Sequence, residues 1–258
     1  GIRASNGRMD IWVIDLIRRS DDRRTFDNVL DNEDKPLWST DGSRLAFRGR
    51  RRGIYSINAR GDEKPKLLTE VPGKPTSWSR ERLLYGFNGG IYLLDGDGSS
   101  PLLVAPKGGL GEFSPDGKYV AMIARSSGAG SQSPEVLIRS LAGEEVRRFP
   151  LARFASSAQW IPGSQALALT LFDSTNTQNL VRLDLVSGAQ SMLVKQSNSP
   201  VTFSPDGKTV YYAPHARTDP VAPRIVAREL ASGNERTVYS SPRGSSALAS
   251  AVSRDGKT

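Results

Sequence analysis

Short apolar runs separated by turns recur along the whole chain, and one phrase makes the repeat visible. In residues 113–122 an aromatic residue is followed by Ser-Pro-Asp-Gly-Lys and then by an apolar run. Residues 203–212 repeat the phrase almost unchanged, and residues 38–47 are a third copy. Residues 252–258 are a fourth, cut off by the end of the sequence. A Gly-containing turn followed by such a run predicts a β-hairpin.

Two weaker copies complete the series. Residues 78–85 keep the aromatic residue, the serine and the apolar run but lack Asp-Gly, and residues 160–169 carry Pro-Gly in the turn. The lead residues of the six copies lie 35 to 49 residues apart; they are Trp38, Trp78, Phe113, Trp160, Phe203 and Val252. Further short apolar runs follow between turn signals, and no window has convincing helical periodicity. Each complete unit therefore holds four short strands.

Repeated four-stranded units of this length are typical of a β-propeller, because a single blade cannot bury both of its faces. We predict an all-β fold, a propeller of about six four-stranded blades, five whole and one split or incomplete, in a single domain spanning 1–258. The whole blades are expected at approximately 36–70, 76–105, 111–151, 158–196 and 201–240. Residues 8–27 would give the third and outer strands of the split blade, and 251–258 its inner strand. Its second strand is not assigned, so the pattern leaves open whether the ring closes or the chain is a piece of a longer propeller.

The third strand of each unit adds a second signature. Residues 10–16, 53–57 and 90–95 read as Ile, then Trp or Tyr, a variable residue and an apolar residue. With the Ser-Pro-Asp-Gly-Lys phrase, this pattern resembles the repeat of TolB-like six-bladed propellers over essentially the whole chain. Residues 10–47 also look like the propellers attached to bacterial membrane-anchored serine/threonine kinases and to some winged-helix regulators. The resemblance implies a fold and leaves the activity open, and no kinase motif occurs in the sequence.

Composition narrows the class of protein only moderately. The 258 residues are 37% apolar and 24% charged, with no apolar run of membrane-spanning length. The chain begins without an initiator Met, so we interpret it as a fragment or an excised domain. Cysteine is absent, which removes disulfides, thiolate nucleophiles and sulfur-ligated metals. The net charge of +8 fits either a solvated basic surface or an anionic partner.

The repeated acids are the first candidates for chemistry. They could form a ring of carboxylates, but each stands in a turn sequence in which Asp accepts from backbone N–H groups and Gly supplies a positive φ. We interpret them as structural; they are Asp41, Gly42, Asp116, Gly117, Asp206, Gly207, Asp255 and Gly256.

The other motifs fail on spacing or on missing partners. His215 is the only histidine, which argues against a Ser–His–Asp triad supported by a Gly-x-Ser-x-Gly elbow and against a transition-metal site, so we interpret it as a loop residue. Residues 95–99 alternate oxygen ligands as a calcium loop would, but the twelfth position is Pro106. The two Gly-Lys-Thr sequences lack the upstream glycine of a phosphate-binding loop. We expect no metal, no cofactor and no catalytic constellation.

One dense cationic cluster stands out in residues 48–52. In a propeller the loops between second and third strands share one face with the loops between blades, and the Asp-Gly turns lie on the other face. This places a candidate binding rim at the loop face; its members are Arg48, Arg50, Arg51, Arg52, Arg125, Arg153, Asp173, His215 and Arg217, with Phe154 beside Arg153. Clustered guanidinium groups are either solvated or paired with an anion.

We therefore expect a non-enzymatic protein- or peptide-binding module, the sensor or scaffold part of a larger bacterial protein. Its partner would be a protein or peptide, possibly anionic, and not a nucleic acid, because interleaved aromatic and basic residues are not visible on one surface. An alternative is the gating propeller of a prolyl-oligopeptidase-like serine peptidase whose catalytic domain is not in this chain. A third is a lyase or hydrolase site inside the channel. A monomeric domain in the periplasm or another extracytoplasmic space is expected, with a cytoplasmic location still open.

Overall fold

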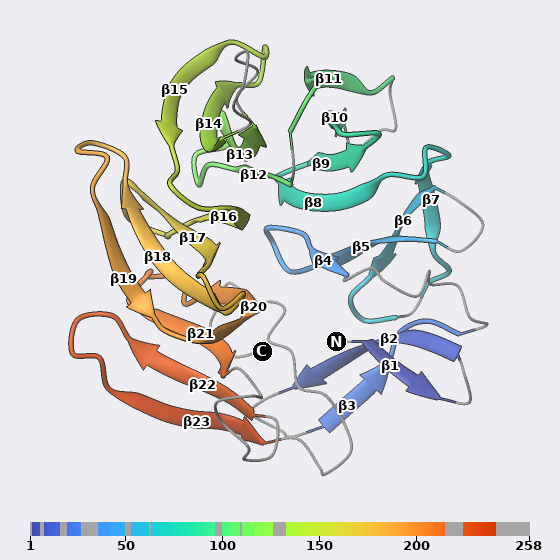
Figure 1. The fold of residues 1–258 in the computed structure, drawn as a ribbon. Helices are drawn as coiled ribbons and strands as arrows, with labels where there is room; N and C mark the ends of the chain where they lie inside the picture. Colours follow the sequence, from blue (N-terminus) through green and yellow to red (C-terminus); the bar gives the residue numbers. More distant parts are fainter. Residues whose placement is uncertain are drawn as a thin grey trace. The chain divides into compact units, whose positions relative to one another are not determined.

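In the computed structural model the described residues form short β-strands joined by turns and loops, with no helix among them (Figure 1). The structure describes residues 2–5, 8–15, 20–26, 36–49, 53–61, 63–95, 100–108, 110–125, 133–214 and 224–240. The expected turn at Asp255 and Gly256 and the expected inner strand at 251–258 lie outside these residues.

The strands form six small sheets, five of them four-stranded. The first is three-stranded: β1 (Ile2–Ser5), β2 (Arg8–Asp15) and β3 (Ser20–Arg23). The next two are β4 (Leu37–Trp38), β5 (Arg44–Arg48), β6 (Ile54–Asn58) and β7 (Lys66–Thr69), then β8 (Lys74–Ser79), β9 (Arg82–Phe87), β10 (Gly90–Asp95) and β11 (Leu102–Ala105).

The remaining sheets follow the same plan. They are β12 (Gly111–Phe113), β13 (Tyr119–Arg125), β14 (Pro134–Ser140) and β15 (Glu145–Pro150); β16 (Ala155–Trp160), β17 (Ala166–Phe172), β18 (Gln178–Asp184) and β19 (Gln190–Val194); and β20 (Ser197–Phe203), β21 (Thr209–Pro214), β22 (Arg224–Glu229) and β23 (Glu235–Ser240). In every sheet the spatial order of the strands is their order in the chain. Each sheet is thus a meander, in which each strand pairs with its neighbours in sequence.

The first sheet contains a strand that the sequence pattern did not assign. β1 pairs antiparallel with β2, with Ile2 opposite Ile11 and Ser5 opposite Arg8. β2 in turn pairs with β3, with Trp12 opposite Arg23. In chain order β1 therefore takes the place of the second strand that the split blade lacked.

The chain divides into two compact units. The first holds the described residues up to Val120 together with residues 139–144, and the second holds the other described residues from Ala121 onward. In the first unit β5 is buried on both faces. Leu45 and Phe47 pack in a cluster with Ile11 of β2, whereas Ala46 packs with Leu83 and Tyr85 of β9.

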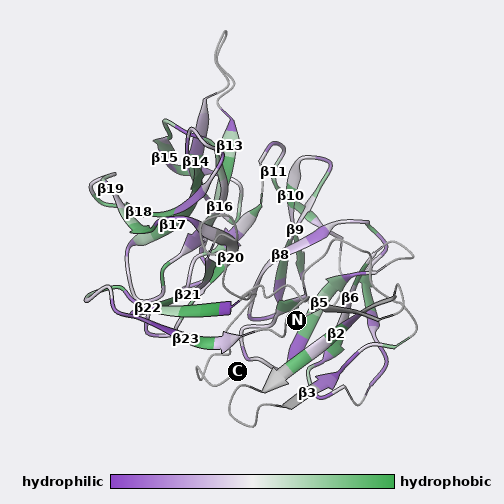
Figure 2. Ribbon diagram, turned by 60° about the horizontal axis from the view of Figure 1, so that its bottom comes forward, coloured by the Kyte–Doolittle hydropathy of each residue, from purple (hydrophilic) through white to green (hydrophobic). Residues whose placement is uncertain are grey.

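Because successive side chains of a strand point to opposite faces, a strand sandwiched between two sheets must be apolar at consecutive positions. This explains the continuous apolar runs after each lead residue. Figure 2 shows the same contrast, with hydrophobic residues along β5 and hydrophilic residues along β3.

The second unit has an equivalent core between two of its sheets. Ala166, Ala168 and Leu180 of the sheet β16–β19 pack with Phe203 and Val210 of the sheet β20–β23. Leu180 and Val210 are fully buried. The outer strands carry more exposed residues, as their single packed face allows.

A common hydrogen-bond pattern closes the Ser-x-Asp-Gly turns. In the turn between β4 and β5, the Ser39 hydroxyl donates to Asp41 and accepts from the amide of Arg44 at 2.9 Å, while the Asp41 carboxylate accepts from the amide of Ser43 at 3.0 Å. The turns at Asp116 and Asp206 repeat the same contacts. These bonds satisfy the polar groups of the turn locally.

Candidate functional site

The structure places four of the nine predicted rim residues. Arg48 is partly buried at the end of β5 in the first unit, and Arg125, Arg153 and Asp173 are in the second. The other five lie outside the described residues; they are Arg50, Arg51, Arg52, His215 and Arg217. The structure therefore does not test the arginine cluster at residues 50–52, which is the most strongly charged part of the predicted rim.

In the second unit the structure brings an aromatic pair together at one end of the sheet β16–β19. Phe154 precedes β16 and Phe172 ends β17, and their rings stack with centroids 5.9 Å apart at an interplanar angle of 30°. The amide of Phe172 donates to the carbonyl of Phe154 at 3.1 Å, so the backbone holds the two residues together. Phe154 nevertheless remains 48% exposed.

One cationic side chain contacts this pair, and a second arginine is its neighbour in sequence. The guanidinium carbon of Arg125, at the end of β13, lies 5.8 Å from the centroid of the Phe154 ring, within the range of a cation–π contact. Arg153, the residue before Phe154, is exposed. We call the surface formed by Arg125, Arg153, Phe154 and Phe172 the aromatic end of the second unit.

The carboxylate of Asp173, another predicted rim residue, is engaged in local hydrogen bonds. Its carboxylate accepts hydrogen bonds from the amides of Thr175 and Thr177, from the Thr175 hydroxyl and from the side-chain amide of Asn179, at 2.6 to 3.1 Å. The Thr175 hydroxyl is the largest of the causes that hold the pKa of Asp173 well below its ordinary value. The carboxylate is thus committed to the turn between β17 and β18, which positions Phe172, and binding at this end is left to the aromatic and arginine side chains.

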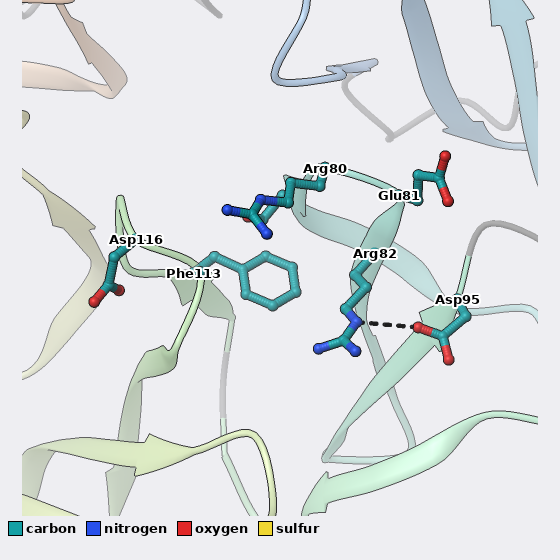
Figure 3. Close-up of a pocket in the computed structure, with 8 residues that line it drawn as sticks. Arg80, Glu81, Arg82, Asp95, Phe113 and Asp116 are labelled. Atoms are coloured by element: carbon teal, nitrogen blue, oxygen red, sulfur yellow. Dashed lines mark ion pairs between the residues drawn. The ribbon is translucent and has the colours of Figure 1, made fainter.

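A pocket lies in the first unit, at the turn ends of its strands (Figure 3). Its volume is about 660 Å³, and Ser79, Arg80, Glu81, Arg82, Asp95, Phe113, Asp116 and Gly117 line it. Arg80, Glu81 and Arg82 belong to the hairpin between β8 and β9, and Phe113 ends β12. We call this the turn-side pocket.

The hairpin at the pocket is the copy of the repeat that lacks Asp-Gly. Ser79 pairs with Arg82, so the connection contains only Arg80 and Glu81. Arg80 is held at φ 53°, the left-handed region that a non-glycine residue adopts only at a cost. After the shared serine, this short turn places two guanidinium groups where the copies at 113–118 and 203–208 have Pro-Asp-Gly-Lys.

The charged groups of the pocket are partly compensated. Arg82 pairs with Asp95 at 3.2 Å (Figure 3). Asp116 accepts from the Ser114 hydroxyl and from the amide of Lys118, and these contacts lower its pKa. Among the residues that the structure describes, the Arg80 guanidinium has no ion-pair partner.

Close packing holds the two turns of the pocket together. A Cβ atom at Gly117 would come within 2.9 Å of the Ser79 hydroxyl, so the second turn lies directly against the first. The Ser77 hydroxyl also accepts from the amide of Phe113 at 3.0 Å. The pocket is therefore built from fixed backbone elements.

Sequence reasoning missed the turn-side pocket. The signal was present: residues 79–82 depart from the turn sequence of the other copies. From the sequence alone, the departure indicates only a weaker copy of the repeat.

Neither a metal centre nor a membrane helix is found in the described part of the chain. No group of three His, Cys, Asp or Glu residues there is arranged to hold a metal ion. No helix there has the length and apolar character needed to cross a membrane.

Similarity to known proteins lies in the structure alone. No protein-family model and no curated protein matches the sequence. Among solved structures, a putative TolB from Agrobacterium tumefaciens matches with a TM-score of 0.73 and 18% identity, covering 97% of this chain and 95% of that chain. TolB from Acinetobacter baumannii matches with a TM-score of 0.62 and 17% identity over 95% of this chain and 69% of that chain.

A third solved structure is a peptidase. The puromycin-hydrolyzing peptidase of Mycobacterium tuberculosis matches with a TM-score of 0.58 and 12% identity, covering 91% of this chain and 49% of that chain. At such identities the likeness shows the fold alone. The small meandering sheets and the match to two TolB structures together confirm the predicted architecture: the chain has the TolB-like β-propeller fold.

Proposed function

We propose that this chain is a protein- or peptide-binding propeller module without catalysis of its own, the sensor or scaffold part of a larger bacterial protein that works outside the cytoplasm. The observation that carries the proposal is the aromatic end of the second unit, where an exposed Phe154 stacks on Phe172 under Arg125. The TolB-like fold supports the proposal without deciding it, since one fold hosts several functions.

The aromatic end has the composition of a binding hot spot. Phenylalanine and arginine are enriched at the centres of protein interfaces, where they supply large contact areas and charged hydrogen bonds. The stack is held in place by the hydrogen bond between the backbones of Phe154 and Phe172 and by the Asp173 turn. A partner would therefore meet a preorganised surface, and little conformational entropy would be lost there on binding.

The charges indicate which partner fits. Arg125 and Arg153 are both exposed beside the rings, and the chain as a whole carries +8. We infer a peptide segment that places an apolar side chain on Phe154 and an acidic side chain near the two arginines. Such a pairing combines apolar burial with charge complementarity.

The test is a selection of displayed random peptides on the whole chain, followed by affinity measurements on variants. Peptides selected on the native chain are expected to lose about 2 kcal/mol, or roughly 30-fold in Kd, with Phe154→Ala. Arg125→Gln should weaken the acidic peptides by several-fold. Met192→Ala is the matched control, because Met192 is 51% exposed on the outer strand β19 of the same unit.

Two results would contradict the proposal. One is a set of selected peptides that binds the Phe154 and Met192 variants equally well. The other is a selection that yields no enriched sequence, although circular dichroism shows the native chain to be folded.

A further inference from the structure

Arg80 is the charged group of the turn-side pocket that remains available to a ligand. It is exposed, and its backbone sits at φ 53° in a two-residue turn that none of the other described copies of the repeat contains. Figure 3 shows its side chain extending over the pocket toward Phe113, whereas the Glu81 carboxylate of the same turn points away from that ring. The geometry thus places one guanidinium beside Phe113, which lines the pocket although only 5% of the residue is exposed.

Two of the three acids that line the pocket, Asp95 and Asp116, already have partners. Arg82 and Asp95 form an ion pair at 3.2 Å. Asp116 is held by the Ser114 hydroxyl and the Lys118 amide, with the Lys118 charge close enough to lower its pKa further. Asp95 is engaged in a cross-strand ion pair with Arg82, and Asp116 is engaged in its own turn. Among the described arginines of the pocket, Arg80 is therefore the one whose guanidinium has no ion-pair partner.

The same acids restrict the charge of the ligand. Three carboxylates, those of Glu81, Asp95 and Asp116, line the pocket together with two arginines. A dianionic phosphate would meet repulsion from them that a single guanidinium does not offset. A carboxylate carries one charge and matches the planar fork of one arginine.

We propose that the turn-side pocket binds a carboxylate carried beside an apolar group, with Arg80 as the ionic contact and Phe113 as the apolar one. A peptide with a C-terminal aromatic or aliphatic residue has this chemistry, and so does a free acyl amino acid. The site goes beyond the proposed function and does not depend on it, because it uses other residues in the other unit.

The test titrates the whole chain with three small probes, followed by NMR of backbone and arginine side-chain N–H groups. N-acetyl-phenylalanine carries the carboxylate, N-acetyl-phenylalaninamide is its neutral counterpart, and phenyl phosphate is the dianion. The acid should bind at least tenfold more tightly than either of the other two. A hexapeptide ending in Phe and its C-terminal amide then separate the two sources, since a peptide site prefers the hexapeptide acid and a small-molecule site prefers the acyl amino acid.

Arg80→Gln should remove the preference for the acid over the amide. This change keeps a long side chain at the same φ, so it removes the charge without a new demand on the backbone. Arg60→Gln is the matched control: Arg60 is also an exposed turn residue of the first unit, and its loss should leave the preference unchanged. Equal binding of acid and amide, an unaltered preference in Arg80→Gln, or tighter binding of phenyl phosphate would each overturn the proposal.

Discussion

Among the described glycines of the hairpin turns, Gly207 has the least room for a Cβ atom, and this predicts a large cost for an alanine there. Gly207 closes the turn between β20 and β21 at φ +68°. A Cβ atom there would lie 2.0 Å from the carbonyl oxygen of Pro162 and 3.0 Å from its carbonyl carbon. Both atoms belong to the backbone of the preceding turn, so no side-chain rotation could relieve the clash.

Gly163 provides a control within the same unit. It stands in the turn between β16 and β17 at φ +69°, and a Cβ atom there would be 3.7 Å from the Asp206 carbonyl oxygen, an ordinary contact. The left-handed penalty for alanine, about 1–2 kcal/mol, is therefore common to both positions. The difference in the free energy of unfolding between the two variants therefore measures the cost of the close approach of the two turns.

We expect Gly163→Ala to cost about 1 kcal/mol and Gly207→Ala about 2–4 kcal/mol, because overpacking adds about 1–3 kcal/mol to the shared backbone term. Urea denaturation measured by circular dichroism gives both values, provided that the slopes of the transitions agree. Equal losses in the two variants would refute the reasoning, since they would show that the turns separate without cost.

Two further predictions concern buried or capped carboxylates. A hydrogen bond from the Ser39 hydroxyl is the main cause that lowers the pKa of Asp41 from 3.8 to about 2. The ionised Asp41 carboxylate therefore stabilises the folded chain fully above about pH 4, and this stabilisation is lost as the pH falls through about 2. The difference in Tm between the native chain and Asp41→Asn should narrow over that range, and a constant difference would exclude this role. Asp10 is 2% exposed and accepts from Arg23 at 2.6 Å and from Thr25 at 3.2 Å. Asp10→Ala should cost about 2–3 kcal/mol in urea, whereas Asp22→Ala, at a 63% exposed side chain, should cost less than about 0.5. If Asp10→Ala and Asp22→Ala lowered the free energy of unfolding equally, the buried Asp10 ion pair would not be the stabilising contact that we infer.

The repeat made most of the architecture predictable from the sequence. Each complete copy contains a lead residue on the first strand, a hairpin turn and a buried second strand, and these are local features with strong sequence signals. The blade expected at 158–196, for example, corresponds to the sheet that begins with β16 at Ala155 and ends with β19 at Val194. β1 could not be found in this way, because its four residues contain neither the turn phrase nor an apolar run. It is a strand through its pairing with β2, which is a tertiary effect.

The candidate sites were less predictable. Chain order placed Arg125, Arg153 and Asp173 on loops of the same face, and the structure adds the stacking of Phe154 on Phe172 with Arg125 over the Phe154 ring. The commitment of Asp173 to its own turn depends on four donors that converge only after folding. A sequence reading can propose an acid on a rim, but it cannot show whether the carboxylate is still available.

The hairpin turns show why a departure from the repeat is informative. Where the Ser-x-Asp-Gly phrase is present, as at Asp206, the polar side chains are used up in closing the turn. The copy at Pro162 and Gly163 lacks the aspartate and has no charged residue in its place. Its Ser164 hydroxyl donates to the carbonyl of Ile161 at 2.9 Å.

The copy at residues 79–82 loses the same bonds, adopts a strained left-handed residue and presents arginines to a pocket. Left-handed residues also occur at Asn88 and Gln196, so backbone strain by itself does not mark a site. What motivates the proposed carboxylate contact is the combination of this strain with an arginine that lines a pocket and has no ion-pair partner in the described part of the chain.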